Sequence, residues 1–220
     1  MPPAVSTRRH RWQSPRVLGS IAAIAVVALV AGLGLIITLR GEENLSVDAA
    51  WMADIVEHRH PAWEVPSLLF DFLGGGIVGV FVVPIALILV LLLTKRRWGA
   101  LYFALATMLS AGLVQILKHT FGRARPEDIL VVSDFGSFPS GHTANAATMA
   151  VTLALILQRA WVWIAGILWT VAMLLSRTYL GAHWLSDTAG GLLVGAAVAT
   201  ILWAVFARRL RRERERIRPA

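Results

Sequence analysis

Long apolar runs separated by short polar segments dominate the pattern of this chain. The runs cover residues 17–39, about 74–93, 100–117, 141–157, 161–175 and 183–207. An α-helix needs about 20 mostly apolar residues to cross a bilayer, so each run is near span length, and the runs 141–157 and 161–175 are expected to include their polar ends. The pattern predicts an all-α, polytopic membrane bundle of about six transmembrane helices.

Polar segments flank this bundle at both ends of the chain. Residues 1–16 are predicted to be a disordered basic tail and 208–220 a charged tail, which leaves 17–207 as one six-span membrane domain. The run 17–39 resembles a secretory signal, but its apolar core is longer than the roughly 7 to 15 residues of a signal peptide. An uncleaved first span is therefore favoured.

The longest polar segment between spans is the loop 40–66. Val47, Trp51 and Ile55 recur at every fourth position after Ser46, a candidate N-cap, which predicts a short amphipathic helix at the membrane interface. A solvated loop with interfacial tryptophans explains the pattern equally well. After Pro66, the glycines 74–76 are expected to mark the start of the second span, and Pro84 is a candidate kink.

Composition and charge narrow the class of protein and its orientation. Hydrophobic residues make up 57% of the chain and charged residues 15%, which excludes an ordinary soluble domain. The net charge of +8 comes mostly from Lys and Arg that flank the apolar runs, so nucleic-acid binding is not expected. Only six of the 21 Lys and Arg lie on the side away from the termini and short turns, so the positive-inside rule places both termini in the cytoplasm. Without cysteine, neither disulfides nor thiolate chemistry is available.

Three polar clusters interrupt the apolar pattern, all on the predicted extracytoplasmic face. They are Lys118 with Arg125-Pro126, then Pro139-Ser140-Gly141-His142, and last Ser176-Arg177 with His183 and Asp187. Ionisable side chains are costly at membrane depth, so their presence there suggests function. Because the clusters are mostly cationic, we expect their partner to be an anion.

Each cluster suits one part of phosphate chemistry. Asp187 lies four residues after His183 on one helix face, so it can fix the imidazole tautomer and leave the other nitrogen as nucleophile or base. Ser140 and Gly141 begin a span, where free backbone amides bind anions, and His142 could protonate a leaving oxygen. Taken singly, each cluster has an ordinary structural explanation, as a helix pair, a cap or interfacial cations.

Together, the three clusters resemble the signature of the type 2 phosphatidic acid phosphatase superfamily, also called lipid phosphate phosphatases. The resemblance runs from the third span to the sixth and implies that His183 attacks phosphorus to give a phosphohistidine, Asp187 orients it and His142 protonates the leaving alkoxide. It also implies that the phosphate oxygens are held without a metal or cofactor by Lys118, Arg125, Ser140, Gly141 and Arg177. The roles of His119 and Arg123 stay open.

We therefore expect a phosphatase in the plasma (inner) membrane with its active site facing the extracytoplasmic side. Its partners would be the bilayer and a membrane lipid phosphate: undecaprenyl diphosphate, phosphatidylglycerol phosphate and phosphatidic acid all fit. Two alternatives remain, a phosphotransferase that passes the phosphoryl group to a lipid or sugar hydroxyl, and a non-catalytic lipid-phosphate binder or scramblase. The pair His142 and His183 argues against the binder, because binding alone needs neither.

Overall fold

The computed structural model describes residues 15–41 and 43–217 of the chain. The tail predicted to be disordered, 1–16, lies almost wholly outside the described residues. The helices, in order, are α1 (Pro15–Leu39), α2 (Ser46–Glu57), α3 (Pro61–Gly74), the π-helical turn η2 (Val78–Val82), α4 (Val83–Leu93), α5 (Arg97–Phe121), α6 (Gly141–Leu157), α7 (Ala160–Tyr179) and α8 (Leu185–Ile217).

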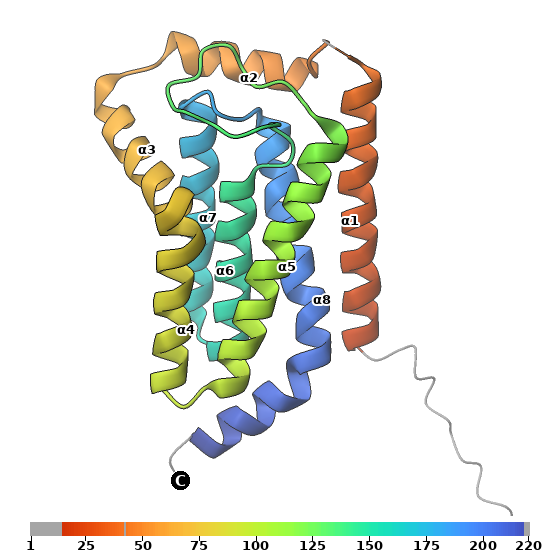
Figure 1. The fold of residues 1–220 in the computed structure, drawn as a ribbon, viewed down its shortest axis with the longest axis vertical. Coiled ribbons are helices and arrows are strands. Elements are labelled where there is room, and N and C mark those ends of the chain that lie inside the picture. Colours follow the sequence, from red (N-terminus) through yellow and green to blue (C-terminus); the bar gives the residue numbers. More distant parts are fainter. Residues whose placement is uncertain (1–14, 42, 218–220) are drawn as a thin grey trace, which may run out of the picture.

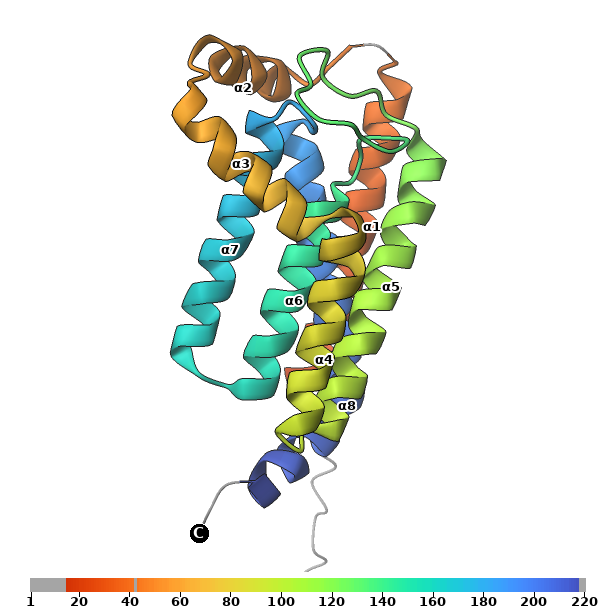
Figure 2. The same cartoon turned by 60° about the vertical axis from the view of Figure 1, so that its left-hand side comes forward.

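The long helices run up and down in one bundle, which confirms the all-α membrane fold (Figures 1 and 2). Helix α6 lies at its centre and packs on α5, α7 and α8, while α1 packs on the outer side of α8 and α5. Helix α2 and the loop between α5 and α6 lie across one end. The first residue of α1 and the last of α8 lie at the opposite end, together with the short turns α4–α5 and α6–α7.

Fewer helices than the expected six are individually long and apolar enough to cross a membrane. Four helices, α1, α5, α7 and α8, are long and apolar enough to cross a membrane, and the bent pair α3 with η2–α4 would make a fifth. Helix α6, with 17 residues, is a shorter apolar helix. The buried hydroxyls of Thr148 and Thr152 donate to backbone carbonyl oxygens of α6 itself, and the Thr148 hydroxyl also lies 2.9 Å from the Ser110 hydroxyl of α5.

The glycines 74–76 lie inside a broken helix rather than at its start. Helix α3 begins at Pro61, contains Pro66, and meets η2–α4 at an angle of 51° after Gly74. The Asn145 side-chain amide of α6 donates to the carbonyl oxygens of Gly74 and Gly79, at 3.4 and 2.8 Å. Pro84 lies directly after the π-helical turn, in the first turn of α4. The break therefore places the end of α3 beside the start of α6.

Two polar segments that flank the membrane spans are helical. Residues 46–57 form the short helix that the fourth-position pattern predicts, with Leu45 rather than Ser46 at the N-cap position. The charged segment after residue 207 stays helical to Ile217 and turns Glu213 toward the first turn of α5. The Glu213 carboxylate accepts hydrogen bonds from the backbone N–H groups of Trp98 and Gly99, at 2.7 and 3.0 Å. It thereby satisfies amides that a helix start leaves free.

Candidate active site

The three polar clusters meet at the end of the bundle covered by α2. The backbone N–H of Ser140 donates to the carbonyl oxygen of Asp187 at 2.9 Å, which joins the second cluster to the third. Arg125 Nη1 donates to the carbonyl oxygen of Ala182 and lies 3.4 Å from His183 Nε2, which joins the first cluster to the third. One site therefore contains residues from three separate helix ends.

His183 lies in the turn between α7 and α8, with its side chain buried. Gly181, at a φ of +64°, reverses the chain just before it. Burial, followed by the charges of Arg177, Arg125 and Lys118, lowers the pKa of His183 well below its ordinary value. The lowered pKa favours the neutral imidazole, the form that has a lone pair for nucleophilic attack, and its Nε2 lies 3.4 Å from Arg125 Nη1.

Asp187 faces His183 Nδ1 across a long contact, but the two residues do not share a helix face as predicted, because α8 begins at Leu185, after His183. The distance from Nδ1 to Asp187 Oδ2 is 3.6 Å, and within the described part of the chain Nδ1 has no hydrogen-bond partner. Asp187 Oδ2 accepts from the backbone N–H of Trp184 at 2.8 Å, and Oδ1 accepts from Arg123 Nη1 at 2.6 Å. Catalytic hydrogen bonds are often long in a substrate-free enzyme and shorten when charge develops.

Asp134, in the loop between α5 and α6, pairs with two of the predicted phosphate ligands. Lys118 Nζ lies 2.9 Å from Asp134 Oδ1, and Arg125 Nη2 lies 2.7 Å from the same oxygen. Burial opposes ionisation of Asp134, but the hydrogen bond and charge of Lys118 and the charge of Arg125 lower the pKa of its carboxyl. The carboxylate is thus a counterion for both cations.

Asp71, on α3, pairs with Arg177, a predicted phosphate ligand, and with His142, the predicted proton donor. Its carboxylate forms an ion pair with Arg177 Nη1, and His142 Nε2 lies 3.2 Å from Asp71 Oδ1. The helix break makes room for this contact, because a side chain at Gly75 would overlap the imidazole of His142. The sequence-based prediction omits Asp71, although a single carboxylate between apolar residues of a membrane segment is itself a functional signal.

Ser140 and His119 lie differently from the other candidates. The buried Ser140 hydroxyl accepts hydrogen bonds from the backbone N–H and the hydroxyl of Thr143, so it caps α6. The predicted role of Ser140 in holding phosphate therefore stays a prediction.

His119, in the last turn of α5, is exposed and stacks on Phe135 with ring centroids 5.5 Å apart. Within the described residues, no group of three His, Asp or Glu is placed to hold a metal ion.

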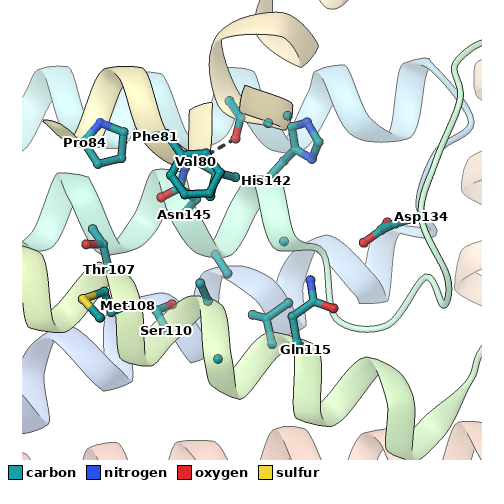
Figure 3. Close-up of a pocket in the computed structure, with 18 of the residues that line it drawn as sticks. Val80, Phe81, Pro84, Thr107, Met108, Ser110, Gln115, Asp134, His142 and Asn145 are labelled. Carbon is teal, nitrogen blue, oxygen red and sulfur yellow. Dashed lines mark hydrogen bonds between the residues drawn. The ribbon is translucent and has the colours of Figure 1, made fainter. Parts of the chain in front are cut away.

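A cavity of about 940 Å³ extends from the polar site into the bundle (Figure 3). Lys118, His142, Arg177 and His183 line its polar end, near Asp134. The rest lies between the broken helix α3–η2–α4 and α5 and is lined mainly by apolar or small residues, among them Phe81, Pro84, Ile85, Ile88, Met108 and Gly112. A ligand that fills this cavity would need an anionic end and an apolar body.

The chain matches a described protein family and several characterised proteins. Residues 99–211 match the model of the PAP2 superfamily. An undecaprenyl-diphosphatase of Sulfolobus acidocaldarius is 29% identical over 125 residues, 53% of this chain and 59% of the relative. A lipid A 1-phosphatase of Rhizobium johnstonii is 32% identical over 123 residues, 50% of this chain and 49% of the relative.

The fold also matches a solved structure. The transmembrane PAP2-type phosphatidylglycerolphosphate phosphatase of Bacillus subtilis superposes with a TM-score of 0.69 at 25% identity, covering 83% of this chain and 96% of that one. The chain spans about half the length of the curated relatives that it matches. The matched segment 99–211 contains all eight predicted site residues but neither α2 nor α3.

Proposed function

The chain belongs to the PAP2 superfamily, and on that basis we propose that it is an integral membrane phosphatase that releases the terminal phosphate of a lipid phosphate or isoprenyl diphosphate. The observation that carries the proposal is the buried imidazole of His183, which faces cationic side chains at the end of an apolar cavity. The relatives named above act on undecaprenyl diphosphate, lipid A and phosphatidylglycerolphosphate, which are all lipids that carry phosphate.

The proposed reaction has two steps that use the same two histidines. In the first, the lone pair of His183 Nε2 forms a bond to phosphorus, the bond from phosphorus to the leaving oxygen breaks, and His142 gives that oxygen a proton. In the second, water attacks the phosphohistidine while His142 takes a proton from the water, and the P–N bond breaks to release phosphate. Lys118, Arg125 and Arg177 neutralise the charge on the phosphoryl oxygens.

A phosphotransferase would share the first step and differ only in the acceptor. If a lipid or sugar hydroxyl replaced water, the phosphoryl group would appear on the acceptor rather than as free phosphate. Hydrolysis is the better-supported reading because the relatives named above are phosphatases. The non-catalytic alternative predicts binding of lipid phosphate without release of phosphate.

We expect purified protein to release phosphate from at least one lipid in a panel of undecaprenyl diphosphate, phosphatidylglycerol phosphate and phosphatidic acid. Release should survive excess EDTA, because the cationic side chains of the chain can do the work of Mg²⁺. Vanadate should inhibit, since it adopts the trigonal bipyramidal shape of the transferring phosphoryl group. Activity that EDTA abolishes and Mg²⁺ restores would contradict the metal-free mechanism, and phosphate on an acceptor would indicate the transferase.

The apolar part of the cavity is the proposed site for the hydrocarbon chain of the substrate. Gly112 lines it, and an added Cβ there would meet no heavy atom within 4 Å, so Gly112→Phe should fold and fill the space. We expect its kcat/KM to fall about tenfold or more for a long-chain lipid phosphate, because the ring would keep the hydrocarbon chain out of the cavity and so misplace the attached phosphate for attack. Turnover of p-nitrophenyl phosphate should change little.

Gly32→Phe is the matched control for this prediction. Gly32 is exposed on α1, away from the cavity, and an added Cβ there also meets open space. This variant should leave both substrates unaffected. Equal losses on the lipid and on p-nitrophenyl phosphate in Gly112→Phe would show that the cavity does not hold the hydrocarbon chain.

The proposed orientation puts the site on the extracytoplasmic side and both termini in the cytoplasm. Glu127 is exposed in the loop at the site end, and Arg159 is exposed in the turn at the opposite end. Because the chain has no cysteine, Glu127→Cys should react with an impermeant thiol reagent in intact cells, whereas Arg159→Cys should react only after permeabilisation. The reverse pattern of labelling would overturn the orientation.

A further inference from the structure

A buried ionic network joins α2 to the helix that carries Asp187. Helix α2 lies across the site end of the bundle and packs on α7 and α8 (Figures 1 and 2). Its Asp48 is fully buried, unlike Asp54 and Glu57 of the same helix. An isolated buried carboxylate is strongly disfavoured, so this position requires a partner of opposite charge and hydrogen-bond donors.

Arg123 and Ser186 supply those partners. Asp48 Oδ2 lies 2.7 Å from Arg123 Nη2 and 2.6 Å from the Ser186 hydroxyl, which donates to it. Asp48 Oδ1 accepts from the backbone N–H of Ser186 at 2.8 Å, so it binds an amide that the start of α8 leaves free. Asp48 therefore fixes both the guanidinium and the first turn of α8.

The same guanidinium bridges to Asp187. Arg123 Nη1 lies 2.6 Å from Asp187 Oδ1 and 2.8 Å from the Ser186 hydroxyl. One planar fork thus serves two buried carboxylates, a geometry that the single ammonium of a lysine cannot reproduce. Arg123 holds Oδ1 of Asp187, and Oδ2, which also accepts from the backbone N–H of Trp184, is the oxygen that faces His183 Nδ1.

We propose that Asp48 and Arg123 are positioning residues for the reaction: they hold Asp187 so that Oδ2 meets His183 Nδ1 as the phosphohistidine forms. When Nε2 gains phosphorus, Nδ1–H becomes part of a cation, and a carboxylate already in place stabilises it without moving. The inference rests on the proposed function. It assigns a role to Arg123 and to the loop 40–66, and Asp48 lies outside the segment 99–211 that matches the family.

The test compares Asp48→Asn with Asp54→Asn, the same substitution at an exposed position of α2. We expect Asp48→Asn to lower kcat between about tenfold and a hundredfold, because a displacement of about 1 Å in a catalytic group has that effect. KM and the inhibition constant of inorganic phosphate should stay nearly constant, since the phosphate ligands are untouched. Asp54→Asn should behave as wild type.

Repeating Asp48→Asn in an Asp187→Asn background separates positioning from general stability. If Asp48 acts through Asp187, its substitution should add little to the loss already caused by Asp187→Asn. Equal further losses in both backgrounds, or a kcat per folded enzyme that equals wild type, would overturn the inference. If Asp48→Asn does not fold, Ser186→Ala, which removes only the hydroxyl shared by Asp48 and Arg123, should give a smaller fall in kcat with unchanged KM, and an unchanged kcat would overturn the inference.

Failure of the proposed function gives a different result. A wild-type protein that releases no phosphate from any lipid of the panel would overturn the phosphatase and, with it, the positioning role. An active wild type whose kcat is insensitive to Asp48→Asn would overturn the positioning role alone.

Discussion

Replacing His183 with alanine should abolish phosphate release from every substrate. Removing a nucleophile leaves only the binding and electrostatic contributions of the site, so kcat should fall by about 10⁴-fold or more. No leaving group compensates for the missing nitrogen, so p-nitrophenyl phosphate and a lipid alkyl phosphate should be affected alike. Rapid quenching in alkaline detergent after incubation with ³²P-labelled substrate should trap a phosphoenzyme that is stable to alkali and labile to acid in the wild type, and none in His183→Ala.

His142→Ala should affect the two substrates differently, in contrast to His183→Ala, which should abolish activity on both. The p-nitrophenolate ion is a weak base and departs with little help from a proton, whereas an alkoxide needs one. We therefore expect a large loss on the lipid and a much smaller loss on p-nitrophenyl phosphate. Equal losses on the two substrates, or a phosphoenzyme still trapped in His183→Ala, would show that the roles are assigned wrongly.

The pH dependence of the wild type should reflect the burial of His183. Its pKa is lowered, so the nucleophile stays neutral as the pH falls through 6.5, the value of an ordinary histidine. Activity should decline on the acid side only when the pH passes the lowered pKa, and on the alkaline side as the leaving-group acid loses its proton. The acid limb of kcat/KM should therefore lie below pH 6.5.

Arg125→Lys should be nearly as damaging as loss of a whole ligand, although the charge is kept. The guanidinium donates at once to Asp134, to the carbonyl oxygens of Ala182 and Gly136, and toward His183 Nε2. A lysine has one nitrogen and cannot make these contacts together. We expect kcat/KM to fall about 10² to 10³-fold, the typical effect of removing one donor to a developing oxyanion.

Inhibition by vanadate should weaken in parallel in Arg125→Lys, because the inhibitor and the transition state use the same donors. Arg159→Lys is the control, since Arg159 is exposed in the turn at the far end of the bundle. Wild-type activity in Arg125→Lys would mean that only the charge at this position matters, and the fork geometry would then play no part.

Local patterns explain why the bundle and the three clusters could be predicted from sequence. Apolar runs mark helices in a membrane, and Lys118, His142 and His183 each lie at or near a helix end that the alternation of the chain brings to one side. Contacts between segments that are far apart in the chain leave no comparable pattern in the sequence. Asp71 meets Arg177 across 106 positions and Asp48 meets Arg123 across 75 positions. These pairings depend on how α2 and the broken helix α3 pack against the other helices, which no local pattern in the sequence indicates.

Ser140 illustrates a second reason why a role could not be predicted from the sequence. A serine before a helix can cap it or contact a ligand, and the letters are the same in both cases. The structure shows the capping arrangement, in which the hydroxyl accepts from Thr143. The glycine triplet 74–76 has the same ambiguity, because such a triplet can begin a helix or break one, and here it lies at the bend between α3 and η2–α4.

The carboxylates that pair with the proposed phosphate ligands bear on the proposed release of product. Lys118 and Arg177 have almost no exposed side-chain surface, so without a phosphate they would be buried charges, which cost several kcal/mol each when unpaired. Asp134 and Asp71 supply the counterions when no phosphate is bound to these cations. As phosphate departs, the two carboxylates can return to the cations, and the favourable pairing offsets part of the attraction that holds the product. Strong cationic binding of the transition state therefore need not slow turnover by trapping inorganic phosphate.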